Sequence, residues 1–152
     1  MNNAYQQTEQ LLRAYQSLKL KIAIDARDIV DLTAEGQKYN TSHKTAKPEE
    51  WDADIDDAIR HKQRIRNRER SMLRTQKLVE RIDNALALLS DEDYELIKNV
   101  YFDGQQASQI SESQKCCVKT IARKRKRIVT ELMVLFYGAD ALEGVGAWSL
   151  KL

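Results

Sequence analysis

Proline, glycine, cysteine and aromatic residues are all scarce in this sequence. Its 152 residues include one proline, five glycines and two cysteines, and aromatic residues make up 7%. Cys116 and Cys117 are adjacent, and adjacent cysteines rarely pair with each other, so a disulfide framework is excluded and a reducing cytosol is favoured. With so few helix breakers and 32% charged residues, the composition favours long helices that expose charge.

Long apolar runs and targeting patterns are also missing. No stretch of about 18 apolar residues occurs, so we expect no membrane-spanning helix and no membrane partner. The opening residues MNNAYQQTEQ lack the basic-then-apolar pattern of a secretion signal. Both absences favour a cytoplasmic protein.

The residue patterns of common enzymes are absent. The two histidines, His43 and His61, have no cysteine or acid at metal-ligand spacing around them. There is no P-loop, glycine-rich phosphate cradle or serine nucleophile elbow. We therefore expect a protein that is not an enzyme, with no catalytic residue, no cofactor and no metal.

What the first half of the chain does contain is helical periodicity. One apolar stripe predicts a helix over residues 4–35, with Asp25 in the position that would complete it; it comprises Leu11, Tyr15, Leu18, Ile22, Ile29 and Leu32. Residues 36–47 have no period and predict a connector. Pro48 suits the first position of a second helix, expected over residues 51–80, whose stripe comprises Trp51, Ile55, Ala58 or Ile59, Ile65, Met72 and Val79 and continues to Leu86.

Two such stripes joined by a short connector predict a coiled-coil-like hairpin over residues 1–80, which would bind a partner or drive oligomerisation. The same stripes fit a homodimer, and periodicity does not separate the two arrangements. The stretch from Arg60 to Arg70 carries six cations and one acid. It is either a solvated helix face or a second strip that faces phosphates.

The last third has shorter segments with sharper boundaries. Ser90 followed by three acids predicts a helix start, and Asp103-Gly104 predicts its end. A short helix within residues 105–112, a turn at 113–117 and a basic helix over 118–135 should follow. We assign residues 81–137 to one domain and 138–152 to a tail. The apolar end of the tail would either fold back over this domain or meet a partner such as RNA polymerase.

Charge in this domain is concentrated on one segment. Residues 115–127 hold seven cations and no acid, including five consecutive cations at 123–127. A short helix, a turn and a second helix with a basic start form the helix-turn-helix plan, in which the second helix enters the major groove of DNA. Ile110 and Ile121 would be its core positions. Cys116 would be a small apolar turn residue.

Three motifs carry a resemblance to a known family. The segments LALLSDEDYELIKNVYFDG, QISESQKCCVKTI and TIARKRKRIVTEL together resemble region 4 of bacterial sigma factors, which reads an upstream promoter element. Each motif is weak alone, and the order and spacing carry the resemblance, which covers about a third of the chain. The N-terminal LLRAYQSLKLKIAIDARDIVDL is similar to the helix that opens RinA- and ArpU-type phage activators.

The resemblance implies an all-α fold in which a long-helix hairpin precedes a helix-turn-helix of the sigma region 4 type. It implies activation of late genes of a phage or prophage in the cytoplasm of a bacterial host. Double-stranded DNA and RNA polymerase would be the partners.

The basic helix supplies the candidate DNA contacts. Residues at its start would face base edges, with Arg123 and Lys119 as the first choices; the full set is Cys117, Val118, Lys119, Thr120 and Arg123. Four further cations would bind phosphates, namely Lys115, Lys124, Lys126 and Arg127.

Two other functions remain open. A phage small terminase subunit also combines a helix-turn-helix with helical oligomerisation, although it usually places the DNA-binding domain first. A helical adaptor would use the basic face to bind an acidic protein. A ring of subunits would favour the terminase, and the absence of DNA binding would favour the adaptor.

Overall fold

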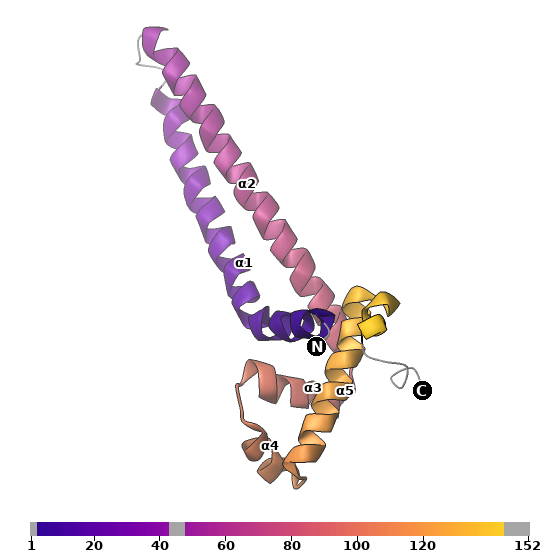
Figure 1. Ribbon diagram of the computed structural model, residues 1–152. Helices are drawn as coiled ribbons and strands as arrows, with labels where there is room; N and C mark the ends of the chain where they lie inside the picture. The colour runs from indigo at the N-terminus through magenta and orange to yellow at the C-terminus, as the bar shows by residue number, and fades with distance from the viewer. Residues whose placement is uncertain (1–2, 43–47, 145–152) are drawn as a thin grey trace. The chain divides into compact units, whose positions relative to one another are not determined.

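The computed structural model describes residues 3–42 and 48–144, and the side chains of residues 3–36 and 55–142. The elements in chain order are α1 (Asn3–Ser42), α2 (Pro48–Ala87), α3 (Asp91–Ile97), the π-helix η1 (Lys98–Phe102), α4 (Ala107–Gln114), α5 (Val118–Tyr137) and the 3₁₀-helix η2 (Ala139–Gly144) (Figure 1). All regular structure in the described ranges is helical, which confirms the all-α class. None of the helices there is long and apolar enough to cross a membrane.

The described chain divides into two compact units. The hairpin unit comprises residues 17–78, and the head unit comprises residues 3–16 together with 79–144. Both long helices pass from one unit into the other. The predicted boundary at residue 80 assigned residues 3–16 to the hairpin, whereas in the structure they belong to the head unit.

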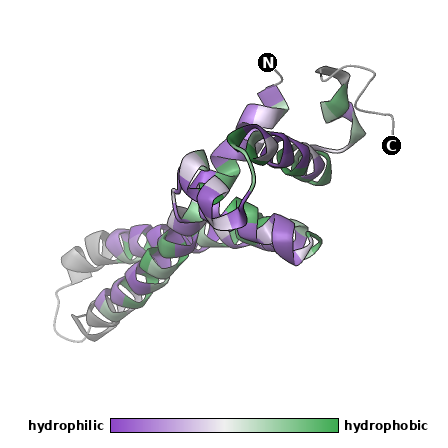
Figure 2. Ribbon diagram, turned by 90° about the horizontal axis from the view of Figure 1, so that it is seen from below, coloured by the Kyte–Doolittle hydropathy of each residue, from purple (hydrophilic) through white to green (hydrophobic). Residues whose placement is uncertain are grey.

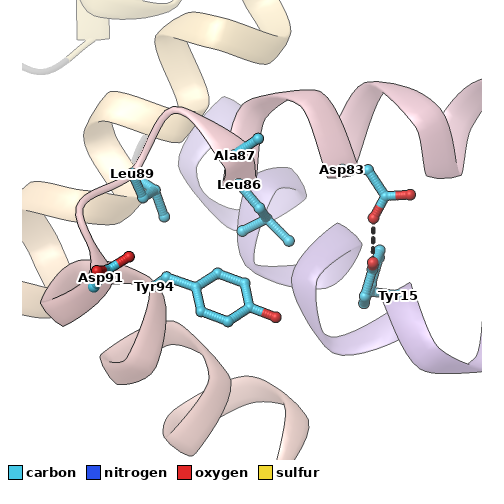
Figure 3. Close-up of a pocket in the computed structure, with 7 residues that line it drawn as sticks. All are labelled: Tyr15, Asp83, Leu86, Ala87, Leu89, Asp91 and Tyr94. Atoms are coloured by element: carbon cyan, nitrogen blue, oxygen red, sulfur yellow. Dashed lines mark hydrogen bonds between the residues drawn. The ribbon is translucent and has the colours of Figure 1, made fainter.

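Contacts of α1 explain why its first turns belong to the head unit. Leu12 is completely buried, and the ring of Tyr15 stacks on Phe102 with centroids 5.0 Å apart. The Tyr15 hydroxyl also donates a hydrogen bond to Asp83 of α2. This bond borders a pocket that is also lined by Leu86 and by Tyr94, whose ring points from α3 toward the α1 side (Figure 3). These partners are 68 to 87 residues away in sequence, so the stripe in α1 alone did not reveal them.

The two long helices differ in length from the prediction. Helix α1 continues to Ser42, beyond the predicted start of the connector at residue 36. Helix α2 begins at Pro48 as expected and continues past residue 80 to Ala87, in agreement with the apolar stripe that reaches Leu86. Nothing in the segment GQKYNTS forces a helix to end, because it contains no proline and a single glycine only weakens a helix. His43, in the predicted connector, lies outside the described residues.

The hairpin unit is held by a seam of heptad positions, which we call the hairpin seam. It comprises Leu18, Ile22, Asp25, Ile29, Leu32 and Gly36 of α1, and Ala58, His61, Ile65, Arg68 and Met72 of α2. Ile55 and Ile59, expected in this stripe, are 48% and 50% exposed. Successive residues are rotated by about 100° around a helix, so the frame of Ala58, Ile65 and Met72 includes His61 and Arg68 instead.

Polar contacts cross the hairpin seam. Asp25 is completely buried; Lys21 pairs with it, and Arg68 of α2 reaches its Oδ1 at 3.5 Å. His61 is also buried, and its Nε2 donates to the carbonyl oxygen of Leu32. A side chain at Gly36 would come within 3.0 Å of the His61 ring, so glycine permits this close packing.

The starts of α3 and α5 in the head unit agree with the prediction from sequence. The Ser90 hydroxyl caps α3 by accepting a hydrogen bond from the backbone N–H of Asp93 at 3.3 Å. Element η1 ends at Phe102 with Asp103 as its cap, and Gly104 follows with a φ of 67°, a conformation that glycine adopts without strain. The start of α5 at Val118 is confirmed, whereas the turn is shorter than the predicted 113–117, because α4 continues to Gln114.

The head unit has a continuous apolar core. It is formed by buried residues of α2, η1 and α3 to α5, including Ile82, Leu96, Ile97, Ile110, Ile121, Ile128, Val129, Leu132 and Met133. Arg81 of α2 donates to the carbonyl oxygen of Phe136 at 2.6 Å, which satisfies a backbone acceptor near the end of α5. Hydrophobic and hydrophilic residues alternate along the helices, as amphipathic packing requires (Figure 2).

Candidate nucleic-acid interface

Helices α4 and α5 are joined by a three-residue turn. Helix α4 ends at Gln114, Lys115 to Cys117 form the turn, and α5 begins at Val118. Ile110 and Ile121, the expected core positions of the two helices, are 0% and 1% exposed. Because both side chains are buried, the apolar core fixes how α5 packs against the rest of the head unit.

The turn depends on an unusual backbone conformation at Lys115. Its φ of 53° and ψ of 39° lie in the left-handed region, where glycine is common after a helix. The backbone N–H of Cys116 donates to the Ser111 carbonyl at 3.2 Å and so closes the last turn of α4. The Cys116 side chain is half-buried, in keeping with the predicted small apolar turn residue.

Helix α5 has one buried side and one open side. Its buried residues are Ile121, Ile128, Val129, Leu132, Met133 and Phe136. Lys119 and Arg123 are exposed and Thr120 is half-exposed. At about 100° per residue these three lie on the side opposite the buried one. The first turns of α5 therefore present two cations and a hydroxyl outward.

The other two candidate base-reading residues lie differently. Cys117 is exposed just before α5, and its sulfur is 3.0 Å from the Thr120 hydroxyl. Val118 is 47% exposed but lies roughly 140° around the helix from Arg123. A flat surface that meets Lys119 and Arg123 would thus not meet Val118 in the same way.

Hydrogen bonds with Thr120 lower the pKa of the Cys117 thiol, with smaller help from backbone groups at the start of α5. The charged thiolate is stabilised there because the first N–H groups of a helix are free to donate. A thiolate would repel a DNA phosphate, so Cys117 suits the interface best as a neutral thiol.

The predicted phosphate-binding cations are of two kinds. Lys115, Lys124 and Lys126 are exposed. The guanidinium of Arg127 instead forms two hydrogen bonds with the Asp93 carboxylate, at 3.0 and 3.2 Å, and one with Glu131 at 3.1 Å. These acids raise the pKa of Arg127, the Asp93 hydrogen bonds most. Arg127 therefore ties α5 to α3, and a phosphate would have to compete with two carboxylates for it.

Of the two acidic partners of Arg127, the sequence could have revealed only one. Arg127 and Glu131 are four residues apart in one helix, a spacing that commonly brings opposite charges together. Asp93 is 34 residues away from Arg127, and only the packing of α3 on α5 brings it near.

Arg125, the central cation of the run, turns toward the body of the head unit. Its Nε is buried, with no hydrogen-bond partner among the described residues. Burial and the nearby Glu9 raise the pKa of Tyr5 and of Tyr101, and the charge of Arg125 opposes this rise. Tyr101 donates a hydrogen bond to Glu9 at 2.8 Å. The basic run thus contributes packing and interior electrostatics as well as an exposed surface.

No family model, curated protein or solved structure matches this chain. The likeness to sigma region 4 therefore rests on the residues of this sequence alone.

Within the described ranges, no group of three or more histidine, cysteine, aspartate and glutamate side chains could hold a metal ion. His61 is occupied by packing in the hairpin seam. The predicted apolar end of the tail, Trp148 to Leu152, lies outside the described residues. The open side of α5 is therefore the best-supported candidate site.

Proposed function

We propose that this chain binds double-stranded DNA with sequence preference and presents α5 to the major groove. The observation that carries the proposal is the open side of α5. It bears Lys119, Thr120 and Arg123 at the start of a helix whose other side is anchored by Ile121 in the core. A rigid helix with exposed cations at its N-terminal turns is what major-groove recognition requires.

The residues of this interface have different roles. Arg123 reads a base edge, because its guanidinium can donate two hydrogen bonds to guanine, and Lys119 reads a neighbouring base. Lys115, Lys124 and Lys126 bind phosphates, which sets the register of the protein without reading sequence. Arg127 holds α3 and α5 together through Asp93 and has the least part in phosphate binding.

The biological role follows from the resemblance to sigma region 4 and to RinA- and ArpU-type activators. In that role the chain activates late genes of a phage or prophage, in the cytoplasm of the bacterial host. It binds a DNA site from which it favours the binding of RNA polymerase to the promoter. The role requires no catalysis, cofactor or metal. A chain that assembles into a ring of subunits in solution would point to the terminase alternative instead.

Selection from a randomised duplex library tests the proposal. The full chain should enrich a defined sequence, and its affinity for that sequence should exceed that for scrambled DNA by about 10³ or more. Arg123→Ala should reduce the discrimination at one base pair by roughly 5- to 150-fold, the equivalent of about 1–3 kcal/mol.

The matched control is Arg27→Ala, which removes an exposed cation of α1 outside the α5 surface and should leave the preference unchanged. Salt-sensitive binding without preference would contradict sequence reading and favour a packaging role. Absence of any DNA binding would favour the protein adaptor.

A further inference from the structure

The outer side of α2 in the hairpin unit is strongly cationic. Seven exposed cations lie between residues 60 and 77, against one acid, Glu69; they are Arg60, Lys62, Arg64, Arg66, Arg70, Arg74 and Lys77. Lys62, Arg66, Arg70, Arg74 and Lys77 follow one another at spacings of three or four residues. At about 1.5 Å per residue they extend over roughly 22 Å of helix. We call these five residues the α2 strip.

Four of the five residues of the α2 strip point away from the hairpin seam, and the fifth, Lys62, is exposed at its edge. At about 100° per residue, Arg70 lies roughly opposite the buried His61, and Arg66 and Lys77 lie beside it. Helix α1 therefore does not cover these side chains, since His61 contacts it from the other side of α2.

Little of this charge is neutralised within the described part of the hairpin unit. Among the described side chains, the cation of this stretch that pairs with acids is Arg68, which reaches Asp25 at 3.5 Å and Asp28 at 3.8 Å. No member of the α2 strip has a carboxylate within 4.0 Å there. Like charges four residues apart repel and destabilise a helix, and Lys62, Arg66, Arg70 and Arg74 make three such pairs in succession.

A helix with such internal repulsion gains stability when an extended polyanion lies along it. We propose that the α2 strip binds the phosphate backbone of double-stranded DNA without reading its sequence. Duplex DNA carries one phosphate charge per about 1.7 Å of its axis, so a strip of about 22 Å meets several phosphates. The inference rests on the proposed function for the identity of the polyanion.

The composition of the strip favours a duplex over a single strand. Proteins that bind single-stranded nucleic acid stack its bases on aromatic side chains, and residues 55–78 contain no tryptophan, tyrosine or phenylalanine. Arginine and lysine at regular spacing provide charge and donors for phosphate oxygens. Binding of this kind raises affinity for every sequence equally.

The test compares two double variants of the full chain on a scrambled duplex. Arg66→Gln/Arg70→Gln removes two charges from the strip, and glutamine keeps a similar helix propensity. Arg27→Gln/Lys98→Gln removes two exposed cations elsewhere. Each phosphate contact contributes about 0.9 to the slope of log affinity against log salt concentration. The strip variant should thus lose about 1.8 from the slope, whereas the control should keep it.

A third variant separates charge from folding. Arg66→Lys/Arg70→Lys keeps both charges and should keep the wild-type slope, and circular dichroism should show the same helix content in all variants. Equal slopes for the glutamine variant and the control would overturn the proposal. A glutamine variant that lowers the salt slope for single-stranded RNA but not for duplex DNA would also overturn it.

The outcome for the strip is distinct from the outcome for α5. The strip variant should keep the preference for the selected sequence over scrambled DNA, because it changes both affinities equally. If wild-type binding shows no preference but the strip variant lowers the slope, the α2 strip stands and the proposed sequence reading fails. If wild-type binding shows the preference but the strip variant has the wild-type slope, the proposed sequence reading stands and the α2 strip proposal fails.

Discussion

The two units of this protein are stabilised in different ways. In the head unit the buried residues are mainly apolar, and Ile82, Ile97, Ile110 and Ile128 are completely buried. In the hairpin unit the buried residues among the described side chains are Asp25 and His61, whereas Ile55, Ile59 and Leu73 are 48 to 50% exposed. Two helices alone cannot enclose apolar side chains, so polar contacts across the hairpin seam have a larger share in fixing its alignment.

The largest effect should come from a cavity in the head unit. Ile121→Ala removes a side chain that is 1% exposed, and such changes typically cost about 2–5 kcal/mol of unfolding free energy. The matched change in the hairpin, Leu73→Ala, removes a half-exposed side chain and should cost less than about 1 kcal/mol. Urea unfolding of both variants measures the difference. Equal losses would show that the hairpin is packed as tightly as the head.

Removal of the buried charge of the hairpin unit should have the opposite effect, a gain in stability. Asp25 is fully buried and its Oδ2 has no hydrogen-bond partner in the described part of the chain, while Arg68 is 41% exposed. Replacing a buried ion pair by apolar residues is often stabilising, so Asp25→Leu/Arg68→Leu should raise the unfolding free energy by about 1–2 kcal/mol. The lost polar pair should also relax alignment, since a polar seam residue selects register and oligomeric state.

Sedimentation and urea unfolding together check this prediction. The double variant should populate larger assemblies that the wild type does not form at the same concentration. Lower stability with unchanged assembly would show that the ion pairs of Asp25 with Lys21 and Arg68 contribute net stabilisation, and that the two units do not differ in the way proposed.

Much of the head unit was predictable because its signals are local. Ser90, Gly104 and the stripe through Ile121 act within a few residues, and the structure confirms the boundaries they predict. Contacts between distant residues were not predictable, as Tyr15 with Asp83 and Arg127 with Asp93 show. The prediction was wrong at Ile55 because two seam positions of α2 are polar, His61 and Arg68. A stripe that is chosen by its apolar residues alone therefore lies on the wrong side of α2.

The turn before α5 should give a smaller effect. A residue other than glycine in the left-handed region is strained by roughly 1–2 kcal/mol, and Lys115 has a φ of 53°. Lys115→Gly should stabilise the protein by about 1 kcal/mol, since the flexibility of glycine in the unfolded chain offsets part of the gain. Thermal unfolding measures this change.

Lys115→Ala is the control for the turn, because it removes the charge and keeps the strain. Both variants should lose about 0.9 from the salt slope of DNA binding if Lys115 contacts a phosphate. Only the glycine variant should be more stable. If alanine stabilises equally, the gain comes from removing charge, and the backbone explanation fails.

The stability of the head unit should depend on pH in the alkaline range. Burial raises the pKa of Tyr101 above its usual value of about 10, and the hydrogen bond it donates to Glu9 raises it further. The stability from neutral Tyr101 is thus fully present below about pH 10, where the unfolded chain also keeps its proton, and it declines as the pH rises above that value. Tyr101→Phe should be less stable than wild type at pH 8, because Glu9 loses its donor, and the difference should narrow toward pH 11. A constant difference across that range would show that Tyr101 ionises as freely in the folded protein as in the unfolded chain.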